Sequence, residues 1–236
     1  MIRGHWLALM LVVGASLAGL ADTVNLKLLN ESPGYTGGGG YYVYPYNFTV
    51  TTSGGSSSQA SLLCDDFNDD IINGESWTAN VNSLQAIAAN NSLGQMTANT
   101  SIAGLTSTTQ AYYEAAWLFG QLGANPTEQH AASINYAIWQ LFSTSALGNT
   151  PATLEGNAGT ADTVAYWLNQ AGQQTFNSSE FGNIVVYTYV PGTPILNGPS
   201  GSPRPQEFFG SVPEPSALLL LASGLLGIGY RRRLFV

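Results

Sequence analysis

The last 25 residues of the chain constrain its fold most, because most of them are apolar and cannot belong to an ordinary surface. They begin with Val212-Pro213-Glu214-Pro215, continue as an apolar run over residues 217–228, and end near Arg231-Arg232-Arg233. At about 1.5 Å per residue this run spans roughly 20 Å, less than the ~30 Å hydrocarbon core of a bilayer. We expect a short transmembrane helix over residues 217–230 that holds a precursor in the inner membrane, with its arginines in the cytoplasm. A helix that docks on a soluble fold and a permanent short anchor are the alternatives.

The order of these three parts resembles the PEP-CTERM sorting signal of Gram-negative bacteria, over residues 212–236. In that family an exosortase recognises the tail, cuts near the Pro-Glu-Pro, and releases or re-anchors the exported protein. The resemblance implies an exosortase-type processing enzyme as a partner. It also implies a membrane-anchored precursor that ends at the cell surface or in the extracellular space.

The N-terminus carries a second processing segment, residues 1–21. Arg3 supplies a positive start, residues 6–20 are apolar, and Gly19-Leu20-Ala21 provides a small-x-small cleavage site before Asp22. We therefore predict a signal peptide over residues 1–21. The remaining residues 22–211 are enough for one globular domain of ordinary size.

Charge and cysteine content exclude several functions for this domain. Of the six Lys and Arg residues only Lys27 and Arg204 lie in it, together with thirteen of the fourteen acids, so its net charge is about −11. Such a domain cannot neutralise phosphates, and we expect no nucleic-acid partner. A single cysteine, Cys64, excludes an internal disulfide.

The apolar periodicity predicts strands, then helices, then strands. The expected strands are residues 24–29, 41–50, 60–64, 77–81, 184–190 and 206–212, and the expected helices are residues 110–122, 126–142 and 162–171. For the second helix we expect Asn125 as the N-cap and Pro126 at the first helical position. This order predicts an α+β fold, in which a β-rich domain (sandwich or barrel-like) carries an inserted helical subdomain.

Catalytic residue types are scarce, and we predict that the protein is not an enzyme and holds no cofactor. Once His5 is removed with the signal peptide, His130 is the one histidine left in the domain, so a Cys/His zinc site is not available. A Ser-His-Asp triad would have to use His130, without a Gly-x-Ser-x-Gly elbow. A histidine at a helix end or on the surface is the preferred interpretation.

The acidic segment with Asp65, Asp66, Asp69 and Asp70 could bind calcium, a cation that prefers several carboxylates. The EF-hand pattern fails, because Ile71 stands where that loop needs glycine. A solvated acidic loop without metal is the preferred interpretation.

Four tyrosines, Tyr41, Tyr42, Tyr44 and Tyr46, lie in the second expected strand. Exposed tyrosines of this kind can form a noncovalent carbohydrate-binding surface. Packing in the core and at the edge of the sheet is the competing interpretation.

Asn135 is the most informative polar residue of the second expected helix. At 100° per residue it lies between Ile138 on one side and Trp139 on the other, and so faces inward among apolar residues. An unpaired buried amide costs about 1–3 kcal/mol. A backbone group, a water molecule or the environment of Cys64 must therefore satisfy it.

Three segments resemble bacterial thioester-type domains: Leu63-Cys64-Asp65, Ala115-Ala116-Trp117-Leu118 and Ile134-Asn135-Tyr136-Ala137-Ile138-Trp139. In that family a cysteine and a glutamine form an internal thioester that reacts with external nucleophiles. The resemblance implies this fold for residues 22–211, with Cys64 and Asn135 at the thioester positions. Asparagine is one methylene, about 1.5 Å, too short for a crosslink between fixed backbones, so we expect the fold without a working thioester.

Together these features predict an exported, non-enzymatic cell-surface or extracellular-matrix protein. The PEP-CTERM resemblance implies an association with extracellular polysaccharide. Two alternatives remain open: a covalent adhesin with a strained bond between Cys64 and Asn135, and a noncovalent carbohydrate-binding module.

Overall fold

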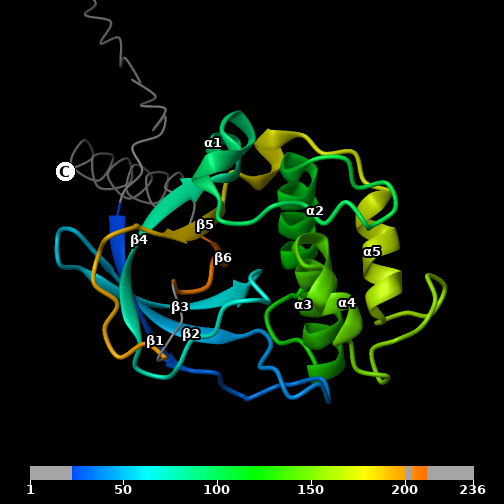
Figure 1. Ribbon diagram of the computed structural model, residues 1–236, viewed down its shortest axis with the longest axis horizontal. Coiled ribbons are helices and arrows are strands. Elements are labelled where there is room, and N and C mark those ends of the chain that lie inside the picture. The colour runs from blue at the N-terminus through cyan, green and yellow to red at the C-terminus, as the bar shows by residue number, and fades with distance from the viewer. Residues whose placement is uncertain (1–22, 200–203, 212–236) are drawn as a thin grey trace, which may run out of the picture.

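The computed structural model describes residues 23–199 and 204–211, and its strands close into an antiparallel barrel (Figure 1). The order around the barrel is β1-β2-β3-β6-β5-β4. The strands are β1 (Thr23–Asn30), β2 (Tyr46–Thr52), β3 (Ser57–Cys64), β4 (Ser76–Ser83), β5 (Ile184–Tyr189) and β6 (Phe208–Ser211). The α+β prediction is confirmed in its barrel-like form. The predicted signal peptide and the sorting segment lie outside the described residues.

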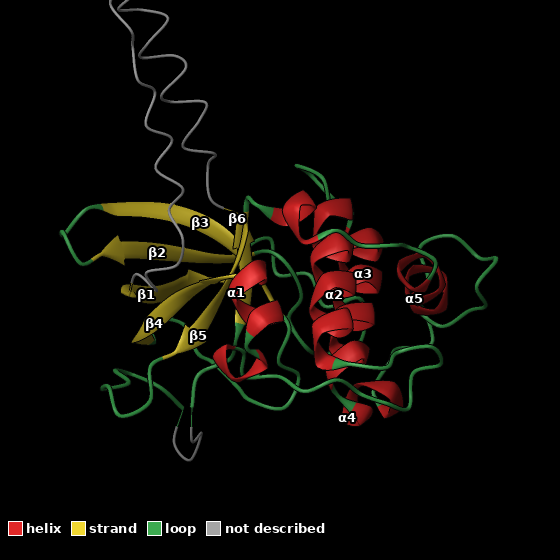
Figure 2. Ribbon diagram, turned by 90° about the horizontal axis from the view of Figure 1, so that it is seen from above, coloured by secondary structure: helices red, strands yellow, loops and turns green. Residues whose placement is uncertain are grey.

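The helices follow β4, precede β5, and form a layer beside the barrel (Figure 2). They are α1 (Leu84–Ala89), α2 (Thr108–Gln121), α3 (Glu128–Phe142), α4 (Thr144–Gly148) and α5 (Val164–Gly172), with 3₁₀ turns η1 (Asn91–Leu93) and η2 (Ser178–Phe181). The predicted helical insertion is present, although α1 and α4 were missed because they are too short to show a period. Within the described ranges, no helix combines the length and apolarity that a membrane crossing requires.

Alternating side chains fill the barrel, as the period of a strand requires. In β1 the side chains of Val24, Leu26 and Leu28 are buried, whereas those between them are exposed. At the centre of the barrel the ring of Phe48 lies edge-on to Trp77, with centroids 5.7 Å apart, and to Phe208, with centroids 4.9 Å apart.

Strand β6 connects the barrel to the helical layer because its neighbouring residues face opposite sides. Phe208 points into the barrel, and Phe209 contacts Tyr112 and Phe119 of α2, with ring centroids 6.1 and 6.4 Å apart. Both faces of β6 are therefore buried at its start, which explains why its two adjacent residues, Phe208 and Phe209, are both apolar.

Helix α3 is the centre of the helical layer. The sequence predicts one apolar stripe through Ala131, Ile134, Ile138 and Leu141, but every residue from 131 to 142 is buried. Because α3 is surrounded on all sides, its residues outside the apolar stripe are buried as well, and the predicted stripe underestimates the burial of the helix. The predicted N-cap is also wrong, because Thr127, not Asn125, accepts the backbone N–H of His130 at 3.3 Å.

Two strand boundaries differ from the prediction by three residues or more. The expected strand over residues 41–50 begins only at Tyr46, because the Val43 N–H bonds to the Tyr35 carbonyl in a loop rather than to a strand. The polar residues Ser57, Ser58 and Gln59 precede the expected strand over residues 60–64, yet they belong to β3 and pair with β2. Their side chains face solvent, so polarity there does not exclude a strand.

Candidate functional site

The two predicted thioester positions lie together where β3 meets α3. Cys64 and Asn135 are both 0 % exposed. The Asn135 amide donates from Nδ2 to the Cys64 carbonyl oxygen at 2.9 Å, and its Oδ1 accepts the Tyr44 N–H at 2.8 Å. The inward orientation predicted for Asn135 is confirmed, and two backbone groups satisfy its amide. Asn135 thereby joins α3, the end of β3 and the chain entering β2.

The Cys64 thiol is held as a neutral donor. Its Sγ donates to the Asp66 carbonyl oxygen at 3.1 Å. Burial raises the pKa of the thiol well above its usual value, and the nearby Asp66 and Asp65 carboxyls raise it further. Because the thiolate is the nucleophilic form, this environment suppresses the reactivity of Cys64.

The two glutamines nearest to Asn135 in α3 have other partners. Gln140 donates to the Thr150 hydroxyl at 2.7 Å. Gln129 donates to the carbonyl oxygens of Thr153 and Asp162, at 3.2 and 3.0 Å. Their amides are engaged in the loops that follow α3, so neither replaces Asn135 beside Cys64.

Next to Cys64 lies a buried pair of carboxyl groups that the sequence did not reveal. Asp65 and Glu207 are 0 % exposed, and the Asp65 backbone N–H bonds to the Glu207 carbonyl at 3.3 Å. Glu207 accepts the Tyr112 hydroxyl at 2.5 Å and the Gln95 N–H at 2.6 Å. Within the described ranges, neither carboxyl oxygen of Asp65 has a hydrogen-bond partner.

Burial raises the pKa of both carboxyls. For Glu207 burial outweighs the hydrogen bonds from Tyr112 and Gln95, and its pKa rises to about 7. For Asp65 burial and the charge of Glu207 raise the pKa well above its usual value. The pair therefore binds a proton that two exposed carboxylates would release near neutral pH. In the sequence, Glu207 is marked only by its position, since it is an acidic residue inside the expected strand over residues 206–212.

The interpretation of the acidic segment as a solvated loop is wrong for half of its residues, since Asp65 and Asp66 are buried. Arg204 lies against it, with Nε 2.8 Å from Asp69 Oδ2 and Nη2 3.5 Å from Asp66 Oδ2. Burial and the charge of Asp69 nonetheless raise the pKa of Asp66 to about 6. Across the described part of the chain, no group of three or more potential ligands is arranged for a metal ion.

His130 is paired with an acid but not with a nucleophile. Its Nδ1 lies 2.7 Å from Asp162 Oδ1, and its Nε2 lies 3.0 Å from the Gln121 carbonyl oxygen. In a hydrolytic triad that second nitrogen faces the serine hydroxyl. Here the pair links the start of α3 to the end of α2 and to the loop before α5.

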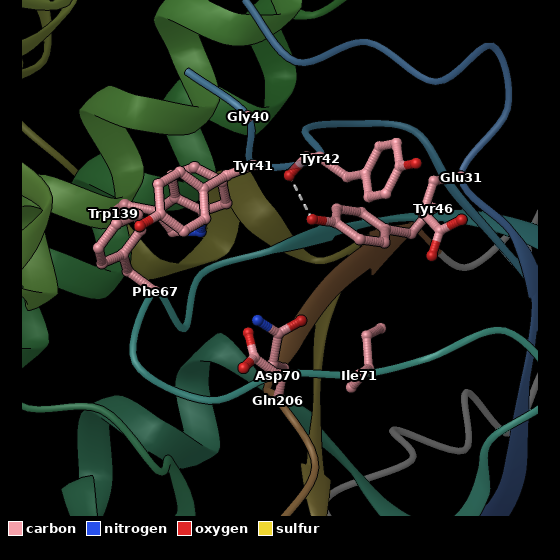
Figure 3. A pocket seen from close by; sticks show the side chains of 10 residues that line it. All are labelled: Glu31, Gly40, Tyr41, Tyr42, Tyr46, Phe67, Asp70, Ile71, Trp139 and Gln206. Carbon is pink, nitrogen blue, oxygen red and sulfur yellow. Dashed lines mark hydrogen bonds between the residues drawn. The ribbon is translucent and has the colours of Figure 1, made fainter. Parts of the chain in front are cut away.

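The four tyrosines divide between surface and core. Tyr41 and Tyr42 are exposed, Tyr44 is half-buried, and Tyr46 is buried with its hydroxyl donating to the Tyr42 carbonyl. Tyr41, Tyr42 and Tyr46 line an open hollow of about 150 Å³ between the barrel and α3 (Figure 3). Packing accounts for Tyr46, whereas Tyr41 and Tyr42 remain available for contacts.

A model of the PEP-CTERM protein-sorting motif matches residues 211–233. The chain thus carries the sorting signal that its sequence resembles, beginning at the last residue of β6. This signal supports a protein that an exosortase sorts to the cell surface, after export and membrane-anchored processing. No curated protein and no solved structure matches the chain, so the thioester-domain resemblance has no support from relatives.

Proposed function

We propose that this protein is a non-enzymatic cell-surface or extracellular-matrix protein that acts through noncovalent contacts after exosortase sorting. The PEP-CTERM motif supports the route to the surface. The observation that carries the noncovalent part is the Asn135 amide, whose donor and acceptor are both used by backbone groups.

A covalent bond at this centre would break those contacts. Attack of the Cys64 sulfur on the Asn135 side-chain carbonyl would form an S–C bond, release ammonia, and remove the N–H that bonds the Cys64 carbonyl. The buried backbone oxygen would lose its partner, at a cost of about 1–3 kcal/mol. The attacking thiolate is itself disfavoured, because burial raises the pKa of Cys64. We therefore assign Cys64 and Asn135 a structural role.

The covalent adhesin remains the second candidate, because both side chains lie in one buried centre. Intact mass spectrometry of the mature protein separates the two. We expect the full mass of the processed chain and one thiol that reacts after unfolding. A mass lower by one ammonia molecule, together with methylamine incorporation that is absent from a Cys64→Ala variant, would establish the adhesin instead.

We propose extracellular polysaccharide as the partner that the protein binds through these noncovalent contacts. The net charge of the domain, about −11, disfavours polyanionic chains as ligands. Binding of purified domain to neutral, cationic and anionic polysaccharides, measured side by side, tests this class of partner. Preference for the anionic chain would contradict it.

A further inference from the structure

We propose that the hollow between the barrel and α3 binds a sugar residue that carries a free, positively charged amino group. This inference rests on the noncovalent function proposed above, since it names the ligand of that surface. The hollow lies between the loop before β2, the segment after β3, and α3 (Figure 3). Its volume of about 150 Å³ is below the ~300 Å³ at which pockets begin to enclose a whole small molecule. It therefore suits a single residue of a longer chain.

The charged and amide side chains that line the hollow present hydrogen-bond acceptors. Glu31 and Asp70 contribute carboxylates. The Gln206 side chain is only 7 % exposed, and its Nε2 is used by the carbonyl oxygens of Asp66 and Asp69. Within the described ranges its Oε1 has no hydrogen-bond partner, and Figure 3 shows the amide directed toward the hollow. A buried acceptor without a partner indicates that a donor belongs there.

The charge around the hollow favours a cation over a neutral or acidic ligand. The two carboxylates are negative, and Arg204, the one arginine in the described part of the chain, is engaged by Asp66 and Asp69. Lys27 is exposed on β1. An ammonium group supplies three donors and a positive charge, so it can pair with Asp70 and Gln206 on one side of the hollow, and Glu31 adds negative charge from the other side (Figure 3).

Aromatic rings form the opposite wall. Tyr41 packs on Phe67 with ring centroids 4.9 Å apart, and Phe67 packs on Trp139 at 5.2 Å. Tyr41 is 42 % exposed, so part of its ring is free for a ligand. A ring beside two carboxylates attracts a cation through its π face and covers the apolar C–H face of a sugar. This combination favours an amino sugar over a small inorganic cation.

The test compares two pentasaccharides that differ only in acetylation of their amines: β-1,4-linked glucosamine and β-1,4-linked N-acetylglucosamine. Isothermal titration of the processed domain at low salt should give at least about tenfold tighter binding of the free amine, since a charge-assisted hydrogen bond is lost on acetylation. Equal affinity, or tighter binding of the acetylated chain, would overturn the requirement for a charged amine.

Variants locate the binding in the hollow. Asp70→Asn and Tyr41→Ala should each lower the affinity for the glucosamine pentasaccharide by about five- to tenfold. Glu155→Gln and Leu147→Ala are the matched controls, because both residues are exposed away from the hollow and should leave affinity unchanged. Equal losses of affinity in the controls would show that binding does not depend on the hollow and follows the overall negative charge of the domain.

Pentalysine with an acetylated N-terminus and an amidated C-terminus provides the last comparison, since it has the same five amines without sugar rings. If the peptide binds as tightly as the glucosamine chain, the hollow does not recognise a sugar and is a site for cations in general. These outcomes are independent of the mass test on Cys64. A full-mass protein that binds no amino sugar would leave the noncovalent function standing and remove this ligand.

Discussion

At the scale of single residues, Asn135 shows how a buried amide can connect three segments that lie far apart in the sequence. Its two hydrogen bonds serve the Cys64 carbonyl and the Tyr44 N–H, which lie at the end of β3 and just before β2. Neither group has a partner in the regular ladder at this point, because β3 ends and β2 has not begun. The asparagine therefore completes backbone pairing that the strands leave open.

Replacing Asn135 by leucine, which has a similar size and no polar atoms, should destabilise the domain by about 3 kcal/mol. The cause is two buried backbone groups left without partners. Urea unfolding followed by tryptophan fluorescence measures the change. Asn169→Leu, at an exposed position of α5, should stay within about 0.5 kcal/mol of the parent protein. An equally small effect at Asn135 would show that its hydrogen bonds contribute little.

At the scale of elements, the glycine-rich loop before β2 is held tightly against α3. Glu128, in the first turn of α3, accepts the backbone N–H groups of Thr36 and Gly37 at 3.0 and 3.1 Å. A Cβ placed on Gly39 would lie 2.1 Å from the Tyr136 hydroxyl oxygen and 2.8 Å from Pro151 Cγ. The glycine is thus needed for close packing of the loop on the helix, and this loop leads directly into Tyr41 of the hollow.

Gly39→Ala should lower the free energy of unfolding by about 1–3 kcal/mol, because the added methyl overpacks the contact with α3. Gly120→Ala is the opposite case. Gly120 is exposed in α2, with nothing within 4 Å of its added Cβ, and alanine is the better helix former there. We expect the second variant to be more stable by about 0.5–1 kcal/mol. Thermal unfolding of both variants checks the predicted difference in sign.

At the scale of the whole molecule, the carboxyl pair at the junction of barrel and helices couples folding to pH. Asp65 follows β3, Glu207 precedes β6, and Tyr112 comes from α2, so the pair joins the two layers of the fold. In the folded protein the pKa of Glu207 is raised from 4.5 to about 7. The folded state therefore holds protons that the unfolded state has released.

Stability should fall as the pH rises from about 4.5 to about 7, because over this range the folded protein keeps the Glu207 proton that the unfolded chain has lost. A shift of this size corresponds to about 3 kcal/mol, and the raised pKa of Asp66 acts in the same direction. The melting temperature at pH 5 should exceed that at pH 8. Glu207→Gln should flatten this dependence, and Glu180→Gln, at an exposed position, should not. A melting temperature that rises with pH would contradict the raised pKa of Glu207.

Sorting is the second prediction at the scale of the whole chain. Replacing Pro213, Glu214 and Pro215 together by alanine should leave the precursor unprocessed, since the motif that matches residues 211–233 would be lost. Intact masses of the protein from membranes and from the medium give the result. Pro191→Ala, in the exposed loop after β5, is the control and should be processed normally. Processing of the triple variant would exclude the motif as the signal.

The sequence alone determined the features that depend on local pattern. Alternating side chains identify β1 and the apolar run identifies β5, as the structure confirms. The inward position of Asn135 follows from helical periodicity, and the order of elements predicted the α+β class. The sorting motif could also be read directly, because a processing enzyme recognises consecutive residues.

Only the tertiary structure decided which distant residues meet. Periodicity placed Asp65 in an acidic segment, but its burial depends on β3 pairing with β6, which brings Glu207 beside it. The hollow likewise combines Tyr41, Asp70 and Gln206 from three separate segments. Local pattern fixes which face a side chain occupies, whereas its partner is set by how the barrel closes, and closure is a property of the whole chain.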